Sequence, residues 1–370
     1  MLIVDAHQDL AWNMLTFGRD YTLSAAQIRL SERGTSIPAQ TDDTMLGWPD
    51  YQRGGVALVF ASLFAAPIHL RAGDWETISY ADLDQANRLY RAQLDLYERL
   101  VDDHNEKFRL IHSRPDLESL LRTWETPPRL DPQTGEVRAG NPVGLAILME
   151  GADALRDPGE LEDWWQWGVR LISPAWASTR YCGGTNEPGP LTSAGFALLE
   201  RMSELGFGLD LSHMDESAVL QALDFYPGQL MASHSNAQAL LKGDPSNRHL
   251  SDHVIRGILE REGVIGVHMY NAFLKAGWVR GDRREEVTTR QVIAQIDYIC
   301  QLAGDASHVG IGSDFDGGVG LQSVPMGIDT IADLGSLAPL LIEKGYSQED
   351  CAAIFGRNWI SLLSKILPET

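Results

Sequence analysis

The chain has 370 residues, 44% of them hydrophobic, which is enough for a large buried core in one oversized domain or two ordinary ones. Its formal net charge of -21 and sequence pI of about 4.8 disfavour nucleic acid and anionic membranes as partners, because an acidic surface repels phosphate groups. Three widely spaced cysteines, with no C-x-x-C pair, indicate reduced thiols in a cytoplasmic protein rather than disulfides or a cysteine metal site.

The two ends of the chain give no sign of export or anchoring. The N-terminus lacks a basic segment followed by a long apolar one, so we expect no signal peptide. No run of about eighteen apolar residues is present, so we expect no spanning helix. The last ten residues are too short and polar for a lipid-anchor signal. We therefore predict a cytoplasmic protein.

Eight short apolar runs predict eight strands. Most are rich in β-branched residues or continuously apolar, as is typical of parallel strands buried on both faces. The runs are Leu2–Val4, Val56–Phe60, Gly144–Leu148, Val169–Ile172, Gly208–Leu211, Gln229–Ala232, Val264–Val267 and Val309–Ile311. Helical patterns lie between most of them and cover Ala81–Asn105, Thr192–Leu205, Glu216–Phe225, Asp252–Glu262, Thr288–Leu302 and Thr330–Lys344. This alternation predicts a (β/α)8 barrel of the TIM type.

Two stretches interrupt the alternation. Residues Arg19–Tyr51 are mixed in polarity, and we expect a long loop with short helices there. Residues Thr123–Pro142 are rich in Pro, Gly and charge, which is typical of an exposed excursion. Because we find no tandem repeat and no interdomain linker, we predict a single barrel domain over residues 1–370.

Polar side chains follow the first predicted strand, in the segment Asp5–Asp9. In an α/β barrel, chemistry gathers at the carboxyl ends of the strands. His7 and Asp9 are two residues apart, so in an extended chain both point to the same side and can chelate one divalent ion. Taken alone, this pair is more typical of a solvated strand-end loop, so a metal interpretation depends on the residues that follow.

A carboxylate ends the third predicted strand. Glu150 comes directly after the apolar run Leu145–Met149, where burial is costly without a partner. A pair of metal ions bridged by this carboxylate would offset the cost. An arginine would offset it too, and Arg156 and Arg170 are both available in the sequence.

Two histidines follow the fifth and sixth predicted strands, in Asp210–His213 and in Ser233–Ser235. A lone strand-end histidine is more often a hydrogen-bonded structural residue than a ligand. His213 and His234 together, added to the earlier imidazole and carboxylates, favour a metal site. Neutral imidazole and carboxylate ligands suit zinc, and also manganese, iron or cobalt.

The eighth predicted strand leads into the segment Gly312–Gly318. Asp314 falls at the strand end, where a carboxylate beside a metal-activated water can serve as general base and then as general acid. The alternative is an Asp turn between glycines that are chosen for their backbone freedom. We expect that turn role for Asp316 rather than for Asp314.

In this order, the motifs resemble the signature segments of the membrane (renal-type) dipeptidase family, which belongs to the amidohydrolase-like superfamily. The similarity runs from His7 to about Asn358, and the order and spacing of the short motifs make it specific. The segments that carry it are His7–Asp9, Gly54–Val56, Met149–Gly151, Gly168–Arg170, Asp210–His213, Ser233–Ser235, Asn247–Asp252 and Gly312–Gly317.

The resemblance implies a zinc-dependent dipeptidase with two divalent metal ions, which we expect to be Zn²⁺. It implies that His7, Asp9 and Glu150 bind one ion. Glu150 would bridge to a second ion held by His213 and His234. Phosphotriesterase-like relatives use a carbamylated lysine as this bridge, so a glutamate favours the dipeptidase branch.

Four further residues receive roles from the resemblance. Asp314 matches the family's proton-shuttling aspartate. Arg248 matches an arginine that recognises the terminal carboxylate of the substrate, and its structural alternative is a surface ion pair with Asp252. Tyr270 aligns with a tyrosine of the substrate pocket. Trp176 stands where the family places a histidine near the scissile carbonyl, and an indole donates one hydrogen bond but carries no charge.

The sequence therefore predicts hydrolysis of dipeptides by a metal-activated water, with a D-residue at the C-terminal position among the candidates. One alternative is an amidohydrolase that acts on N-acyl amino acids, related amides or lactones. Another is a non-catalytic barrel that is retained for binding. We expect a small dipeptide as partner, no nucleic acid and no membrane, and we leave a homodimer open.

Overall fold

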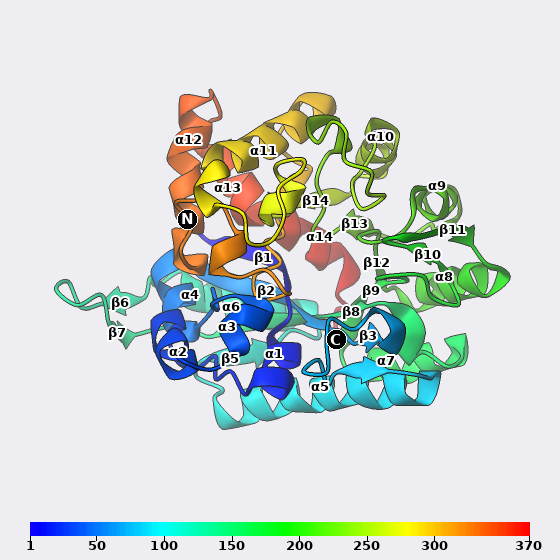
Figure 1. Ribbon diagram of the computed structural model, residues 1–370, viewed down its shortest axis with the longest axis horizontal. Helices are drawn as coiled ribbons and strands as arrows, with labels where there is room; N and C mark the ends of the chain where they lie inside the picture. Colours follow the sequence, from blue (N-terminus) through cyan, green and yellow to red (C-terminus); the bar gives the residue numbers. More distant parts are fainter.

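The computed structural model describes residues 1–370 and contains a closed barrel of eight parallel strands (Figure 1). Going around the barrel, the order is β2-β1-β15-β14-β13-β12-β9-β8, and β8 pairs with β2 to close it. The barrel strands are β1 (Ile3–Gln8), β2 (Val56–Leu63), β8 (Val143–Glu150), β9 (Val169–Ser173), β12 (Gly208–Asp210), β13 (Leu230–Ala232), β14 (Val264–Val267) and β15 (Val309–Ile311). The predicted fold class is confirmed, and each predicted strand overlaps one of these eight.

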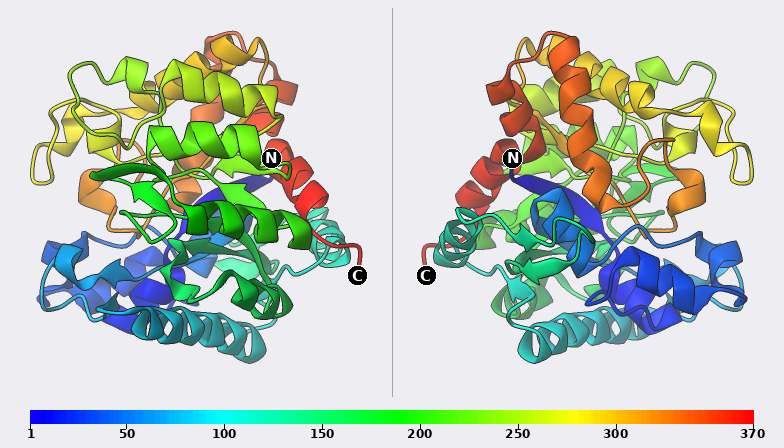
Figure 2. Two further views of the ribbon diagram at one scale, coloured as in Figure 1. Left: turned by 90° about the vertical axis from the view of Figure 1, so that its right-hand side faces the viewer. Right: turned by 90° about the vertical axis from the view of Figure 1, so that its left-hand side faces the viewer.

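Helices surround the barrel, as both views of Figure 2 show. They are α1 (Leu10–Phe17), α2 (Ala25–Glu32), α3 (Ile37–Thr41), α4 (Trp48–Gly54), α5 (Leu83–Asp103), α6 (Arg114–Trp124), α7 (Leu161–Gln166), α8 (Ser193–Leu205), α9 (Glu216–Phe225), α10 (Asp252–Glu260), α11 (Thr289–Ala303), α12 (Leu337–Glu343), α13 (Gln348–Ala352) and α14 (Asn358–Ile366). None of them combines the length and the apolar character that crossing a bilayer requires.

The predicted helices begin where a polar side chain caps the first turn. The Asp82 carboxylate accepts the Gln85 N–H at 2.8 Å before α5, and Thr288 and Gln291 form a reciprocal capping box before α11. The predicted helix Thr330–Lys344 is divided: a 3₁₀ segment, Ile331–Ser336, precedes α12.

Short elements outside the barrel strands were not predicted. Strand β5 (Phe108–Leu110) pairs with the start of β8. Two small hairpins are formed by β6 (Arg129–Leu130) with β7 (Val137–Ala139), and by β10 (Cys182–Gly184) with β11 (Glu187–Leu191). The first lies in the predicted excursion and projects from the body at the left of Figure 1. The short strands β3 (Ala66–Pro67) and β4 (Ser79–Tyr80) form a further pair.

Two buried carboxylates tie neighbouring strand ends together. Asp5 accepts the Ser313 N–H at 2.7 Å and the Ser313 hydroxyl at 2.5 Å, which joins β1 to the end of β15. Asp210 accepts the Ser233 N–H at 2.8 Å and the Ser233 hydroxyl at 2.5 Å, which joins β12 to the end of β13. Each tie fixes the register of a loop that carries a predicted site residue.

The C-terminal helix α14 closes the opposite end of the barrel, where the strands begin. Its first residue, Asn358, donates to the carbonyls of Ala306 and Val309 at 2.7 Å each. The neighbouring Trp359 is fully buried, packs edge-on against Phe60 with ring centroids 5.3 Å apart, and donates to a carbonyl of β15. The N-terminus lies beside this helix in Figure 2. The barrel interior is therefore a packed core, and only its other end is available for a site.

The excursion at residues 19–51 is anchored by Asp316. This residue lies in the predicted turn, but its carboxylate is fully buried and does not face solvent. It accepts the Tyr21 hydroxyl at 2.7 Å, the Thr44 hydroxyl at 2.5 Å and the Met45 N–H at 2.8 Å, and Arg19 lies 3.3 Å away. A single carboxylate of the β15 loop thus holds the excursion against the carboxyl ends of the strands.

We predict that Asp316→Ala destabilises the protein strongly, because it leaves buried donors and the Arg19 charge without their acceptor. The expected loss is about 3–5 kcal/mol in the free energy of unfolding, measured by urea denaturation. Asp43→Ala is the control, since Asp43 is half-buried and accepts only from the exposed Gln322 amide; it should cost about 1 kcal/mol or less. Equal losses in the two variants would contradict the anchoring role.

Candidate metal centre

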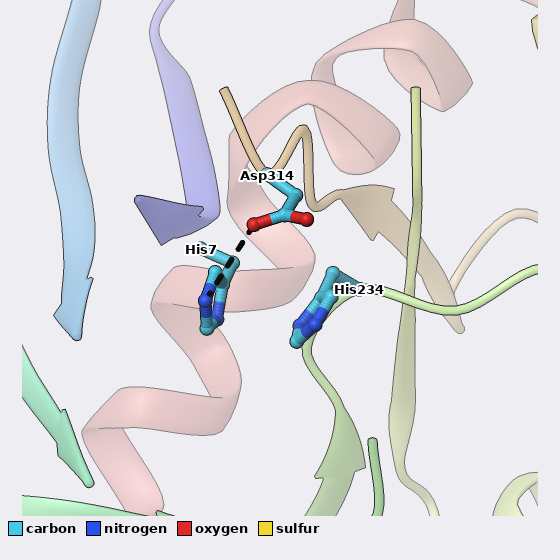
Figure 3. Close-up of side chains that lie close together, drawn as sticks. All are labelled: His7, His234 and Asp314. Atoms are coloured by element: carbon cyan, nitrogen blue, oxygen red, sulfur yellow. Dashed lines mark ion pairs between the residues drawn. The ribbon is translucent and has the colours of Figure 1, made fainter. Parts of the chain in front are cut away.

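Four strand ends bring the five predicted ligands together at one mouth of the barrel. His7 belongs to β1 and Glu150 ends β8, while Asp9, His213 and His234 follow β1, β12 and β13 within three residues. All five side chains are buried or nearly so. Figure 3 shows His7, His234 and Asp314 at the ends of three different strands, with their polar atoms pointing toward one another.

The first group of potential ligands is His7, Asp9 and Glu150, whose ligand atoms lie within 4.8 Å of one another. The Nε2 atom of His7 is 3.5 Å from Glu150 Oε2 and 3.7 Å from Asp9 Oδ2. These separations are too long for hydrogen bonds. They suit atoms that share one ion, because ligands about 2.1 Å from a tetrahedral metal lie roughly 3.4 Å apart.

The second group is Glu150, His213 and His234. Glu150 Oε1 is 3.1 Å from His213 Nε2 and 3.5 Å from His234 Nε2, and the two Nε2 atoms are 2.9 Å apart. Each oxygen of Glu150 therefore faces a different group of imidazoles. This is the arrangement of a carboxylate that can bridge two ions.

Unpartnered polar atoms support the fit of a metal at this place. Both ring nitrogens of the fully buried His7 have no hydrogen-bond partner in the protein. Buried polar atoms without partners are costly, so an ion would satisfy a nitrogen that the fold leaves unsatisfied. The arginines that could have neutralised Glu150 bind elsewhere: Arg156 pairs with Asp84 and Glu160, and Arg170 donates to backbone carbonyls.

The negative charge of the buried carboxylates also favours binding of a cation at this centre. Burial alone would lower the pKa of His7, but the carboxylates of Glu150 and Asp9 outweigh it and hold that pKa well above its usual value. Burial alone would raise the pKa of Glu150, but His7 and His213 hold it below its usual range. The carboxylates thus draw a proton onto His7, and a bound metal ion would take the place of that proton.

Two predicted residues sit in a strained backbone conformation. His213 and Asp314 have positive φ values of 68° and 59°, which residues other than glycine rarely adopt. Gly317 shows how close the packing is, because a Cβ at this position would collide with the carboxylates of Asp314 and Asp9. The local chain is therefore shaped to aim these side chains inward.

Asp314 lies beside both groups, and its carboxylate forms a third set of potential ligand atoms with His7 and His234. Its Oδ1 is 3.7 Å from His7 Nε2, and its Oδ2 is 3.0 Å from His268 Nε2 (Figure 3 shows the first of these contacts). Burial raises the pKa of Asp314 well above its usual value, and Asp9 and Glu150 act in the same direction against the opposing charge of His7. A raised pKa makes the Asp314 carboxylate a stronger base than an ordinary aspartate, which suits it to proton transfer.

A cavity of about 480 Å³ leads to the centre, a size in the range of small-molecule sites. Asp9, Glu150, His213 and Asp314 form part of its wall, so the potential ligands are accessible from it. Aromatic and apolar residues form much of the remainder, namely Trp12, Phe64, Leu70, Trp75 and Trp176. Residues 39–41 of the anchored excursion lie across the same cavity.

A comparison with protein families decides the class of the protein. The model of the family described as membrane dipeptidase, peptidase family M19, matches residues 132–367, more than half of the chain. The chain belongs to the membrane dipeptidase family. The predicted family and the predicted class, a metal-dependent hydrolase that acts on dipeptides, are confirmed, and the alternative of a non-catalytic barrel loses its support.

The chain is also similar to individual proteins, one of them named as a dipeptidase. An uncharacterized protein of the pqqA 5' region in Klebsiella pneumoniae is 30% identical over 284 residues, which are 74% of this chain and 94% of that protein. Dipeptidase tcpJ of Claviceps purpurea is 25% identical over 283 residues, which are 74% of this chain and 59% of the fungal protein.

Solved structures share the fold over nearly all of their length. The dipeptidase AC, a metallopeptidase of family M19, superposes with a TM-score of 0.77 at 24% identity, covering 99% of both chains. A metallopeptidase from Rhodobacter sphaeroides, liganded with a phosphinate mimic of the dipeptide L-Ala-D-Ala, gives 0.79 at 23% identity, again with 99% of both chains covered.

The predicted substrate residues Trp176 and Tyr270 differ in their position relative to the cavity. Trp176 lines the cavity, with its ring 5.0 Å from Phe64 and 6.2 Å from His213. Tyr270 does not line it and packs instead on His268, Phe273 and Trp278. Its role as a substrate residue stays a prediction that the cavity does not support.

Arg248 is buried rather than exposed. Its guanidinium donates to the Ser235 hydroxyl at 2.9 Å and to the His234 carbonyl at 2.5 Å, while its Nε has no partner. The alternative of a surface ion pair with Asp252 is wrong, because Arg248 is buried and donates to Ser235 and His234 instead. Burial lowers the pKa of Arg248 to about 10, so the side chain is still charged at neutral pH.

The sequence reasoning missed several residues that touch the centre. The Thr185 hydroxyl is 3.0 Å from His213 Nδ1, and the Ser62 hydroxyl bonds Asp9. Glu76 lines the cavity, and Arg280 is the arginine in its wall. Single hydroxyls and isolated charged side chains carry no spacing signal, so only the folded chain reveals them.

We predict that His213→Ala weakens metal binding, because it deletes a ligand of the second group and leaves His7 and Asp9 intact. Metal content after dialysis against a chelator, measured by plasma mass spectrometry, should fall below that of the wild type. His249→Ala is a matched control, since His249 is a buried histidine that packs on Phe273 outside both groups. Full metal content in His213→Ala would show that His213 is no ligand.

Proposed function

We propose that the chain hydrolyses dipeptides at a centre of two zinc ions. The observation that carries this proposal is the pair of ligand groups that share Glu150 at the floor of the cavity. The first ion would be held by His7, Asp9 and Glu150, and the second by Glu150, His213 and His234. Imidazole and carboxylate ligands without cysteine suit zinc, with manganese, iron and cobalt as the competing ions.

Two ions bound here would supply Lewis-acid polarisation of the peptide carbonyl and lower the pKa of the attacking water. The residues of the chain perform the proton transfers. Asp314 accepts the proton of the water and delivers it to the leaving amine, which suits a buried carboxyl group of raised pKa. His268, 3.0 Å from Asp314 Oδ2, holds that carboxylate in place.

Two arginines are candidates for binding the carboxylate of the substrate. Arg248 has a buried, charged guanidinium that adjoins His234 and is attracted electrostatically by Asp314. Arg280 lines the cavity but already donates to the carbonyls of Gln40 and Gly318. We propose Arg248, because its Nε lacks a partner and because a carboxylate bound near Asp314 places the scissile bond at the metal centre.

The cavity wall supports dipeptides with apolar side chains. Trp12, Trp75 and Trp176 provide aromatic surface for such side chains, and we propose Trp176 as a direct contact. We include D-residues at the C-terminal position among the substrates, since the Rhodobacter sphaeroides structure of the same fold holds a mimic of L-Ala-D-Ala. N-acyl amino acids, related amides and lactones are the competing substrates.

We propose a cytoplasmic location on the basis of the cysteines. All three cysteines are buried and unpaired, which supports a reducing, cytoplasmic location. A homodimer is compatible with this account, and none of the roles proposed above requires a second chain.

We predict that Asp314→Asn retains both metal ions and loses turnover, because the amide keeps the shape of the side chain but cannot accept a proton. The expected fall in kcat is about 10²–10⁴-fold for a dipeptide substrate. Asp43→Asn, which changes a half-buried carboxylate outside the ligand groups and the cavity wall, should keep both the metal and the activity. Wild-type kcat in Asp314→Asn would remove Asp314 from the proposed proton transfer.

We predict that Arg248→Met raises KM about 10- to 100-fold for dipeptides, because it deletes charged hydrogen bonds to the substrate carboxylate. Arg280→Met should raise KM less than threefold, and thermal melting of both variants reports their folding. The reverse pattern, a large rise in KM for Arg280→Met alone, would transfer carboxylate recognition from Arg248 to Arg280.

A further inference from the structure

We propose that Asp210 and Ser233 are positioning residues that hold His234 in the tautomer that a metal ligand needs. The inference deepens the proposed function and rests on the metal centre described above. It assigns a role to a buried carboxylate and a hydroxyl that neither bind the ion nor line the cavity.

The Asp210 carboxylate is surrounded by donors. Its Oδ1 accepts the Ser212 N–H at 3.0 Å and the Ser233 N–H at 2.8 Å, and its Oδ2 accepts the Ser233 hydroxyl at 2.5 Å. Because both oxygens act as acceptors, the hydroxyl proton of Ser233 points toward Asp210. The direction of this one hydrogen bond is thereby fixed.

The remaining lone pairs of Ser233 Oγ decide the tautomer of His234. Oγ lies 2.8 Å from His234 Nδ1, and since its own proton is directed to Asp210, it accepts the Nδ1–H of the imidazole. The Nε2 atom of His234 then carries a free lone pair. This is the nitrogen that faces Glu150 Oε1 and His213 Nε2.

A parallel contact orients the second imidazole. The Thr185 hydroxyl is 3.0 Å from His213 Nδ1 and 3.5 Å from the His213 carbonyl, so it can accept from the ring while donating to the backbone. Two Nε2 lone pairs and Glu150 Oε1 then converge with no proton between them. Three acceptors that face one another in this way suit a bound cation, with each imidazole oriented by the hydrogen bond at its Nδ1 atom.

The packing around Ser233 leaves this arrangement little freedom. Asp210 and Ser233 are fully buried and His234 nearly so. A Cβ at Gly266 or at Gly312 would collide with the Ser233 carbonyl, so β14 and the residue that follows β15 pack directly against the end of β13. The Ser212 hydroxyl accepts the His234 N–H at 3.1 Å and fixes the backbone of the ligand.

The pair of Asp5 and Ser313 supplies a matched comparison within the same barrel. Ser313 donates its hydroxyl to Asp5 at 2.5 Å and its N–H at 2.7 Å, which repeats the geometry of Ser233 on Asp210. No imidazole contacts the Ser313 hydroxyl. Loss of Ser313 therefore removes hydrogen bonds of the same kind between strand ends, without affecting the tautomer of a histidine.

The test is competition of the zinc-loaded protein against a chelator series, together with the visible spectrum of the cobalt-substituted protein. Ser233→Ala should weaken binding of one of the two ions about 10- to 100-fold and change the cobalt absorption bands. Asp210→Asn should do the same, because its amide NH₂ would donate to Ser233 and let the hydroxyl proton turn toward His234. Ser233→Thr, which restores the hydroxyl, should remain within about threefold of the wild type.

Ser313→Ala serves as the control and should also remain within threefold. The proposal is overturned if Ser233→Ala binds both ions like the wild type with an unchanged cobalt spectrum, or if Ser313→Ala loses as much affinity. If Ser233→Ala does not fold, the metal affinity and cobalt spectrum of Asp210→Asn are compared with those of Ser233→Thr, and the same limits apply. A wild-type chain that binds fewer than two ions would instead contradict the proposed function, so the two failures are distinguishable.

Discussion

The carboxylate of Glu150 is enclosed at the end of β8, with one oxygen toward His7 and the other toward His213 and His234. Removing such a charge from water is costly unless opposite charge or hydrogen-bond donors replace the solvent. No arginine or lysine pairs with it, and the imidazoles present ring nitrogens that suit an ion. The barrel closure, the strand ties and the strained turns all serve to keep this carboxylate between the two groups of ligands.

The same constraint explains why the surrounding polar residues are tied so firmly. His213 and Asp314 hold unfavourable backbone angles, and Gly317 leaves room between two carboxylates. Asp5, Asp210 and Asp316 lie near the carboxyl ends of the strands, and each is buried with donors around it. Unfavourable backbone angles persist only where neighbouring contacts hold the chain in place, and the hydrogen bonds to these three carboxylates provide such contacts.

The barrel and the ligand groups could be predicted because their signals are local. Continuous apolar runs mark buried parallel strands. In an α/β barrel the carboxyl ends of these strands lie at one face, so the residues that follow each run meet there. His7, Asp9, Glu150, His213 and His234 therefore meet as expected. The turn at Asp316 was predicted, but its anchoring carboxylate was not, since its partners lie about three hundred residues away in the chain. The burial of Arg248 and the exclusion of Tyr270 from the cavity likewise depend on loop paths that no local pattern encodes.

We propose that this member of the membrane dipeptidase family cleaves dipeptides at a two-ion centre. The most direct measurement combines metal content and substrate preference on one purified sample. A library should contain dipeptides with L- and D-residues at the C-terminal position, N-acyl amino acids and lactones. The account predicts two zinc ions per chain and turnover of dipeptides that is lost when the zinc is removed. One ion or fewer per chain with full activity, or turnover of acylated amino acids or lactones with none for any dipeptide, would contradict it.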